Sequence, residues 1–160
     1  MGQPVSICRE QIEILKQLAR YTSRTRARIC AHPDTANPLH EMIILHARDA
    51  YVRPHRHPGK SESFHVIEGD ADIILFDDDG KVENVIPMGE KGSGKAFYYR
   101  LNQATYHSLL IRSDIFIFHE TTNGPFQPGA SEFAPWAPLE EDRESVERFM
   151  NQDFQALCKP

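Results

Sequence analysis

The stretch PHRHPGKSESFHVIEG, residues 54–69, holds the pattern that decides the fold. His55 and His57 are two residues apart, and Glu62 follows five residues later. If the residues up to His57 form a strand, both imidazoles project from one face, because side chains alternate between the faces of a strand. A Pro-Gly pair then breaks that strand, so Glu62 opens the next one and can face back toward the histidines. Two imidazoles and a carboxylate on one face suit a divalent transition metal with open coordination positions.

A later strand supplies a candidate for a fourth ligand. TYHSLLI, residues 105–111, carries His107, and metal sites of this kind usually draw ligands from more than one part of a fold. Imidazole and carboxylate ligands suit iron, zinc, nickel and manganese alike. The sequence therefore predicts one divalent transition-metal ion as the cofactor and leaves its identity open.

The segments around this motif predict a strand-rich middle of the chain. They are short, rich in β-branched and aromatic residues, and separated by turn signals such as DDDG at 77–80 and RSD at 112–114, both of which fit hairpins. Closely spaced strands without helices between them favour a sandwich or a barrel over a parallel α/β sheet. The predicted strands are 39–47, 49–57, 62–69, 70–77, 81–87, 95–101, 105–111 and 115–122.

Helical spacing appears only toward the two ends of the chain. Residues 5–21 place apolar side chains on one helical face, with Ser6 available as an N-cap, and residues 142–157 show a second helical pattern. We expect a single domain over residues 1–160. It divides into an N-terminal helix with an arginine-rich stretch (1–36), a barrel core (37–125) and a C-terminal extension with a helix (126–160).

Charge and composition exclude several classes of partner. The formal net charge of -5 argues against a general nucleic-acid binder, which needs a broad basic face. No stretch reaches the 18 apolar residues that span a bilayer, and no apolar run near the start is long enough for a signal peptide. Three widely spaced cysteines form no disulfide framework, so we expect free thiols. These features predict a cytoplasmic protein with a small-molecule substrate and without nucleic-acid or membrane partners.

Several further side chains are candidates for catalysis or substrate binding. His32, in a loop, could act as an acid or base or serve only the turn. Glu120 could be a base or metal partner inside the barrel, or form a salt bridge. Tyr98 and Tyr99 alternate on one strand, so either Tyr99 or its neighbours face the cavity; Tyr99 is the catalytic candidate. The candidate substrate-binding cations are Arg28, Lys60 and Arg100.

Arg28 belongs to a cluster of four arginines within nine residues of chain. Two interpretations of this cluster remain open. Guanidinium groups would suit a phosphorylated substrate through bidentate contacts, or the cluster forms a solvated end of the first helix. The four residues are Arg20, Arg24, Arg26 and Arg28.

The spacing H-x-H, four residues, E, six residues, G resembles the first motif of the cupin superfamily, and the later strand histidine resembles the second. This resemblance implies that His55, His57, Glu62 and His107 bind one metal ion inside a barrel. The fold it implies is all-β: a single double-stranded β-helix (jelly-roll, cupin) barrel with an N-terminal and a C-terminal α-helix. Cupins are often dimers, and the resemblance is the basis for expecting a homodimer.

A narrower resemblance covers roughly residues 24–138. The runs YVRPHRHPGKSESFHVIEG, FDDDG, YHSL, ETTNGPF and APWAP are similar to WbuC-type cupin metalloproteins, which are associated with O-antigen and surface-polysaccharide gene clusters. The resemblance implies a small sugar or nucleotide-sugar intermediate as substrate. It supplies no reaction.

The ligand set itself suggests what the chain does. A metal ion with open positions can polarise a sugar carbonyl while a nearby His, Tyr or Glu moves a proton, which is isomerase or epimerase chemistry. With iron, the same ligands would suit a dioxygenase. The alternative from another class is a non-catalytic cupin that binds a metal or ligand. We favour an enzyme, because a purely structural metal site would be closed to solvent.

Overall fold

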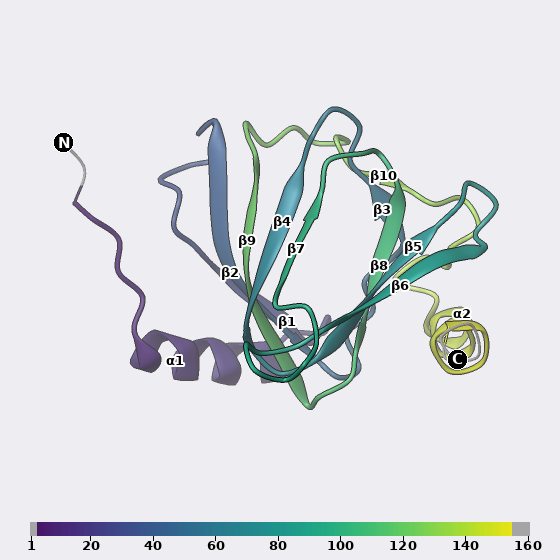
Figure 1. The fold of residues 1–160 in the computed structure, drawn as a ribbon, viewed down its shortest axis with the longest axis horizontal. Helices are drawn as coiled ribbons and strands as arrows, with labels where there is room; N and C mark the ends of the chain where they lie inside the picture. The colour runs from purple at the N-terminus through teal and green to yellow at the C-terminus, as the bar shows by residue number, and fades with distance from the viewer. Residues whose placement is uncertain (1–2, 155–160) are drawn as a thin grey trace.

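The computed structural model describes residues 3–154, which form two antiparallel five-stranded sheets (Figure 1). The first sheet has the order β1-β2-β9-β4-β7, and the second has the order β10-β3-β8-β5-β6. The first sheet consists of β1 (Arg26–Cys30), β2 (Leu39–Ala47), β9 (Ile115–Asn123), β4 (Glu62–Glu68) and β7 (Tyr98–Leu101). The second consists of β10 (Glu132–Phe133), β3 (His55–Arg56), β8 (Tyr106–Ile111), β5 (Ala71–Phe76) and β6 (Val82–Met88).

The main core lies between the two sheets. Phe64 and Phe118 come from the first sheet, while Ile73 and Leu109 come from the second, and all four are buried in one cluster. The rings of Phe64 and Phe118 have centroids 4.6 Å apart. Each such buried side chain contributes about 1.5–3 kcal/mol relative to an exposed one. The predicted all-β jelly-roll fold is confirmed.

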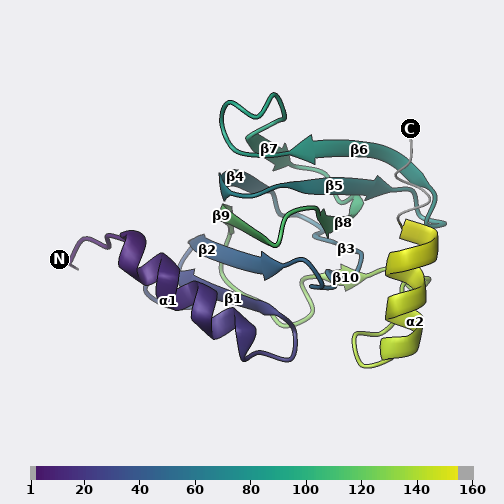
Figure 2. The same ribbon diagram turned by 90° about the horizontal axis from the view of Figure 1, so that it is seen from below.

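Helix α1 (Arg9–Arg20) covers the outer face of the first sheet, where Figure 2 shows it beside β1 and β2. Leu15 and Ala19 are buried against Leu45 and Ile117 of that sheet. The helix begins at Arg9 instead of residue 5, and Cys8 is its N-cap in place of Ser6, with its N–H donating to the Gln11 side chain at 2.7 Å. Because α1 covers one face and the core the other, the middle of β2 is apolar on both faces, with Ile43 and Leu45 toward α1 and Ile44 toward the main core.

The C-terminal segment covers the outer face of the second sheet (Figure 2). Asp142 caps α2 (Arg143–Arg148) by accepting a hydrogen bond from the Ser145 N–H at 3.1 Å, and a π-helix follows at Phe149–Phe154. Residues 155–157 of the predicted helix, and Cys158, lie outside the described residues. Neither α-helix in the described part of the chain is long and apolar enough to cross a membrane.

The arginine-rich stretch differs from one of its two interpretations, a solvated helix end. Arg26 and Arg28 belong to β1, which pairs with β2 so that Arg26 is opposite His46 and Arg28 is opposite Ile44. Strand pairing overrides the local charge pattern here, because alternate residues of β1 such as Ile29 pack under α1. Both arginines therefore share the sheet face of His46 and Ile44, which is the inner face of the barrel.

The two predicted hairpin turns have different outcomes. Asp77 and Gly80 form the tight turn between β5 and β6, with the Asp77 N–H donating to the Lys81 carbonyl at 2.9 Å. Residues 112–114 do not close a hairpin, because β8 belongs to the second sheet and β9 to the first. This turn carries the chain from one sheet to the other.

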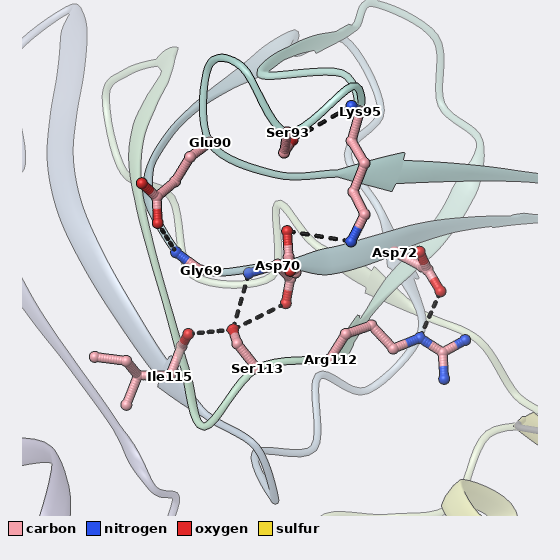
Figure 3. A network of polar contacts seen from close by, with 9 residues as sticks. All are labelled: Gly69, Asp70, Asp72, Glu90, Ser93, Lys95, Arg112, Ser113 and Ile115. Carbon is pink, nitrogen blue, oxygen red and sulfur yellow. Dashed lines mark hydrogen bonds and ion pairs between the residues drawn. The ribbon is translucent and has the colours of Figure 1, made fainter.

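The sheet-crossing turn contacts Gly69 and Asp70, which follow β4 (Figure 3). The Ser113 hydroxyl accepts from the Asp70 N–H at 2.8 Å and donates to the Ile115 carbonyl. Gly69 has a positive φ of 83°, and a Cβ at this position would collide with the Ile115 carbonyl oxygen. The glycine that ends the motif is therefore required by close backbone contact.

Candidate metal centre

Three imidazoles from two β-segments meet at one end of the barrel. His55 lies on β3 opposite His107 on β8, and His57 follows β3 directly. One ring nitrogen from each histidine lies within 4.8 Å of the other two. A group of this kind could hold a metal ion, and the side chain of His107 is only 3% exposed. The two histidines of the motif and the histidine of the later strand therefore lie together in the fold.

Each of these rings is held through its Nδ1 atom. His55 Nδ1 donates to the Arg53 carbonyl at 2.8 Å, and His107 Nδ1 donates to the Thr105 carbonyl at 2.9 Å. His57 Nδ1 lies 3.0 Å from the Ser131 hydroxyl. A carbonyl can only accept, so His55 and His107 carry a proton on Nδ1, and in the neutral ring the free lone pair is on Nε2. Metal-ligating histidines are oriented in this way.

Glu62 lies beside two of the imidazoles. Its Oε1 atom is 2.8 Å from His107 Nε2, and its Oε2 atom is 3.4 Å from His57 Nε2. The Oε1 and His107 Nε2 atoms are both buried, and within the described residues they have no polar partner other than each other. Two atoms bound about 2.1 Å from one metal at a right angle lie about 3 Å apart. The separation of Glu62 Oε1 and His107 Nε2 therefore fits two atoms that coordinate the same metal ion.

Burial and mutual charge set the protonation of the group. Burial, helped by the charges of His107 and His57, lowers the pKa of His55 to about 3, which keeps the ring in the neutral form that binds metals. Burial opposes the ionisation of Glu62, but contact with His107 and His57 outweighs it and holds the Glu62 pKa below its usual range. Burial likewise opposes the charge on His107, yet Glu62 raises the His107 pKa.

The histidines open onto a cavity of about 890 Å³. Its walls come from the inner faces of both sheets and from residues of the segment 126–141. Glu120 on β9 is part of the wall, and burial, together with the negative charge of Glu62, raises the Glu120 pKa to about 8. A carboxyl with this pKa can exchange a proton near neutral pH. The site therefore combines candidate metal ligands, space for a ligand and a proton-transfer group.

The predicted candidates divide between the cavity and other places. Arg28 and Glu120 line the cavity. Tyr99 points into the barrel, where its hydroxyl is buried without a hydrogen-bond partner and burial raises its pKa, while its neighbour Arg100 is exposed on the other face of β7. Of the two alternatives for this strand, the structure therefore places Tyr99 inside.

His32 and Lys60 do not line the cavity. The His32 ring stacks on His40 with centroids 4.1 Å apart, and its Nδ1 atom contacts the Glu41 backbone. Lys60 donates to the Pro125 carbonyl at 3.3 Å. The structure does not bring these two side chains together with the three imidazoles.

Sequence reasoning missed two residues at this site. Arg53 precedes His55 and His57 at the same two-residue spacing, so strand alternation alone could have included it. Ser131 contacts His57 from a segment 74 residues away, and no local pattern marks it. Both residues act on the orientation of the imidazoles.

Comparisons with known proteins support the fold. A family model with the description "Domain of unknown function (DUF6016)" matches residues 7–88, just over half of the chain. The comparison with curated proteins found no match. Among solved structures, protein SO0799 from Shewanella oneidensis is similar over 74% of this chain and 82% of its own, at 9% identity and a TM-score of 0.58.

Two further solved structures are similar at 16% identity. A Klebsiella pneumoniae protein described as having a double-stranded β-helix domain matches over 67% of this chain and 79% of its own, with a TM-score of 0.50. Oxalate decarboxylase from Bacillus subtilis matches over 68% of this chain with a TM-score of 0.51, and the match spans only 27% of that longer chain. These likenesses show the cupin-type fold and no more than the fold.

Proposed function

The chain belongs to the family described as a domain of unknown function, DUF6016, and we propose that it is a metal-dependent enzyme of the cupin fold. His55, His57 and His107, with Glu62, would hold one divalent transition-metal ion. The observation that carries this proposal is the anchoring of all three rings through Nδ1, which leaves their Nε2 atoms for a metal beside an open cavity.

The substrate that we propose is a small sugar or nucleotide-sugar intermediate. The cavity of about 890 Å³ lies within the range of about 300–1,000 Å³ that is usual for small-molecule sites. The resemblance of the motif runs to WbuC-type cupins supports a role in surface-polysaccharide, including O-antigen, synthesis. A cytoplasmic location and a homodimer remain part of the proposal.

The reaction that we propose is an isomerisation or epimerisation by proton transfer. A bound divalent ion would act as a Lewis acid on a sugar carbonyl. For an isomerisation, Glu120 as a carboxylate accepts the proton from the carbon next to that carbonyl and, as a carboxylic acid, returns it to the former carbonyl carbon, while the hydroxyl proton on the first carbon passes to the former carbonyl oxygen. Tyr99, whose buried hydroxyl has no hydrogen-bond partner within the described residues, is the candidate donor of the proton to the opposite face that an epimerisation needs.

Metal analysis followed by a substrate panel tests this function. Purified protein should carry about one divalent ion per chain by mass spectrometry, and His57→Ala should lose the ion while circular dichroism shows a folded protein. Metal-loaded protein is then incubated with nucleotide sugars, with Glu120→Gln as the variant that keeps the metal and loses turnover. Ligand-induced stabilisation without turnover across the panel would favour a non-catalytic binder over an enzyme.

A further inference from the structure

Four arginines line the cavity beside the imidazoles, but only two of them have a carboxylate partner. Arg24 and Arg26 both pair with Glu140, at 3.0 and 3.1 Å. Both therefore have a carboxylate partner within the chain, although the two guanidinium groups share one negative charge. The other two are Arg28 and Arg53.

Arg28 presents its guanidinium to the cavity from the inner face of β1. Among the residues that the structure describes, its side chain makes one hydrogen bond, a long one of 3.9 Å to the Met42 sulfur. Glu120 interacts with Arg28 electrostatically, yet no ion pair joins the two side chains. Within the described residues, the Arg28 charge thus lacks a bound counter-ion.

Arg53 reaches the same cavity from the segment that carries the metal motif. Its guanidinium lies over the Phe133 ring, 4.9 Å from the centroid, and one terminal nitrogen donates weakly to the Ala134 carbonyl at 3.4 Å. Its Nε atom is buried and has no hydrogen-bond partner. No carboxylate of the described residues pairs with Arg53, although an unsatisfied buried donor is costly. The ring holds the guanidinium in place and leaves its charge uncompensated.

We propose that Arg28 and Arg53 form an anion subsite in this cavity, which binds a carboxylate or a phosphate of the small ligand that the metal group acts on. The guanidinium fork matches both oxyanions through paired hydrogen bonds. An anion would supply the partner that the buried Arg53 Nε lacks. The inference deepens the proposed function and rests on it, because it restricts the substrate to an acidic or phosphorylated sugar.

Calorimetric titration of three probes tests the subsite. Glucose 1-phosphate and glucuronate carry the two oxyanions, and glucose is the neutral control. Each is titrated into chelator-treated protein and into metal-loaded protein. We expect at least one of the two anions to bind in both states and glucose to bind in neither, and the anion that binds more tightly identifies the source of the charge.

Substitutions assign the binding to the two arginines. Arg28→Gln and Arg53→Gln should each weaken binding by about 10- to 100-fold, as expected for losing hydrogen bonds to a charged group. Arg28→Lys keeps the positive charge but lacks the paired guanidinium N–H groups, so its anion affinity should lie between those of the unmodified protein and Arg28→Gln. Arg100→Gln, on the exposed outer face of β7, is the matched control and should bind like the unmodified protein.

Two results would overturn the subsite: equal binding of glucose and the anions, or no anion binding at millimolar concentration. Unchanged binding by both glutamine variants would also do so, provided that circular dichroism shows them to be folded. Failure of the proposed function is a separate result. If the protein carries no metal but binds anions through these arginines, the anion subsite is supported and the proposed metal-dependent enzyme is contradicted.

Discussion

His55 and His107 are direct register partners on β3 and β8, with ring centroids 4.6 Å apart. Strand β3 is only two residues long and lies between β10 and β8. The position of His55 therefore depends on its pairing with β8 and on the Arg53 carbonyl that accepts from its ring. Two of the candidate metal ligands thus lie where the short strand β3 pairs with β8, whose residues are all buried.

Removing His107 should abolish tight metal binding. His107→Ala takes away one of three imidazoles, so we expect metal affinity to fall by more than the roughly 10- to 100-fold typical of losing an outer hydrogen bond. The metal-free variant should also be about 3 kcal/mol less stable, because Glu62 loses its buried partner. Chelator competition and urea unfolding measure the two effects. His119→Ala, on the outer face of β9, is the control and should keep the metal.

Loss of the Ser131 hydroxyl should weaken metal binding without removing a ligand. Ser131→Ala frees His57 Nδ1 from its contact at 3.0 Å, and we expect about tenfold lower metal affinity. Ser131→Thr keeps a hydroxyl and should restore most of the affinity. If chelator competition gives the same affinity for Ser131→Ala as for the unmodified protein, Ser131 does not orient the ring.

The sequence predicted a sandwich or barrel, and the proximity of His55 and His57, because both follow from short-range pattern, whereas His107 joins the group through the resemblance of its strand to the second cupin motif. Alternation in a strand places His55 and His57 together, and a β-rich run with turn signals leaves few architectures. Gly69, the glycine that ends the motif, belongs to the same local pattern, and the structure shows that its backbone conformation leaves no room for a side chain. Such features depend on residues that are close in the sequence, so they can be predicted without knowing the tertiary packing.

Other features were not readable because distant segments determine them. Arg26 and Arg28 form a strand only because β2 is beside them, and the charge pattern alone suggested a helix end. The hydroxyl of Ser131 and the Glu140 carboxylate reach the cavity from the C-terminal segment, whose path over the barrel depends on tertiary packing. The turn at 112–114 resembles a hairpin locally, but its flanking strands belong to different sheets.

Substitution of Gly69 should destabilise the barrel more than substitution of another glycine with positive φ. Gly69→Ala imposes a left-handed conformation on alanine and a collision with the Ile115 carbonyl, whereas Gly92→Ala, at φ 99°, has open space around it. We expect Gly92→Ala to cost about 1–2 kcal/mol of unfolding free energy and Gly69→Ala clearly more. Equal losses in urea unfolding would show that the close contact at Gly69 is relieved by a backbone shift.

Stability of the metal-free protein should fall as the pH drops from about 6.5 to 5. Burial, together with the charge of Arg26, lowers the pKa of His46 to about 3, and the pKa of His55 is also about 3. Both rings stay neutral in the folded protein, while in the unfolded chain they take up protons below about pH 6.5. The unfolded state then binds more protons, so each histidine removes up to about 1.4 kcal/mol per pH unit.

The substitution His46→Phe separates the two histidines. The His46 ring stacks on Phe118 and its Nδ1 atom has no hydrogen-bond partner, so phenylalanine keeps the ring contact and loses no bond at that atom. The His107 pKa is raised by folding, so protonated His107 stabilises the folded protein. That stabilisation is fully present below the pKa of the unfolded chain, about 6.5, so His107 adds no pH dependence to the unfolding free energy in this window. Glu120, whose folded pKa is about 8, is protonated in the folded protein and ionised in the unfolded chain across this window, so it offsets about one histidine. We therefore expect the variant to lose most of the pH dependence in urea unfolding, because His55 and Glu120 then nearly cancel. An unchanged slope would mean that His46 is protonated in the folded protein, and its position in the cavity wall would then make it a further cation near Arg28.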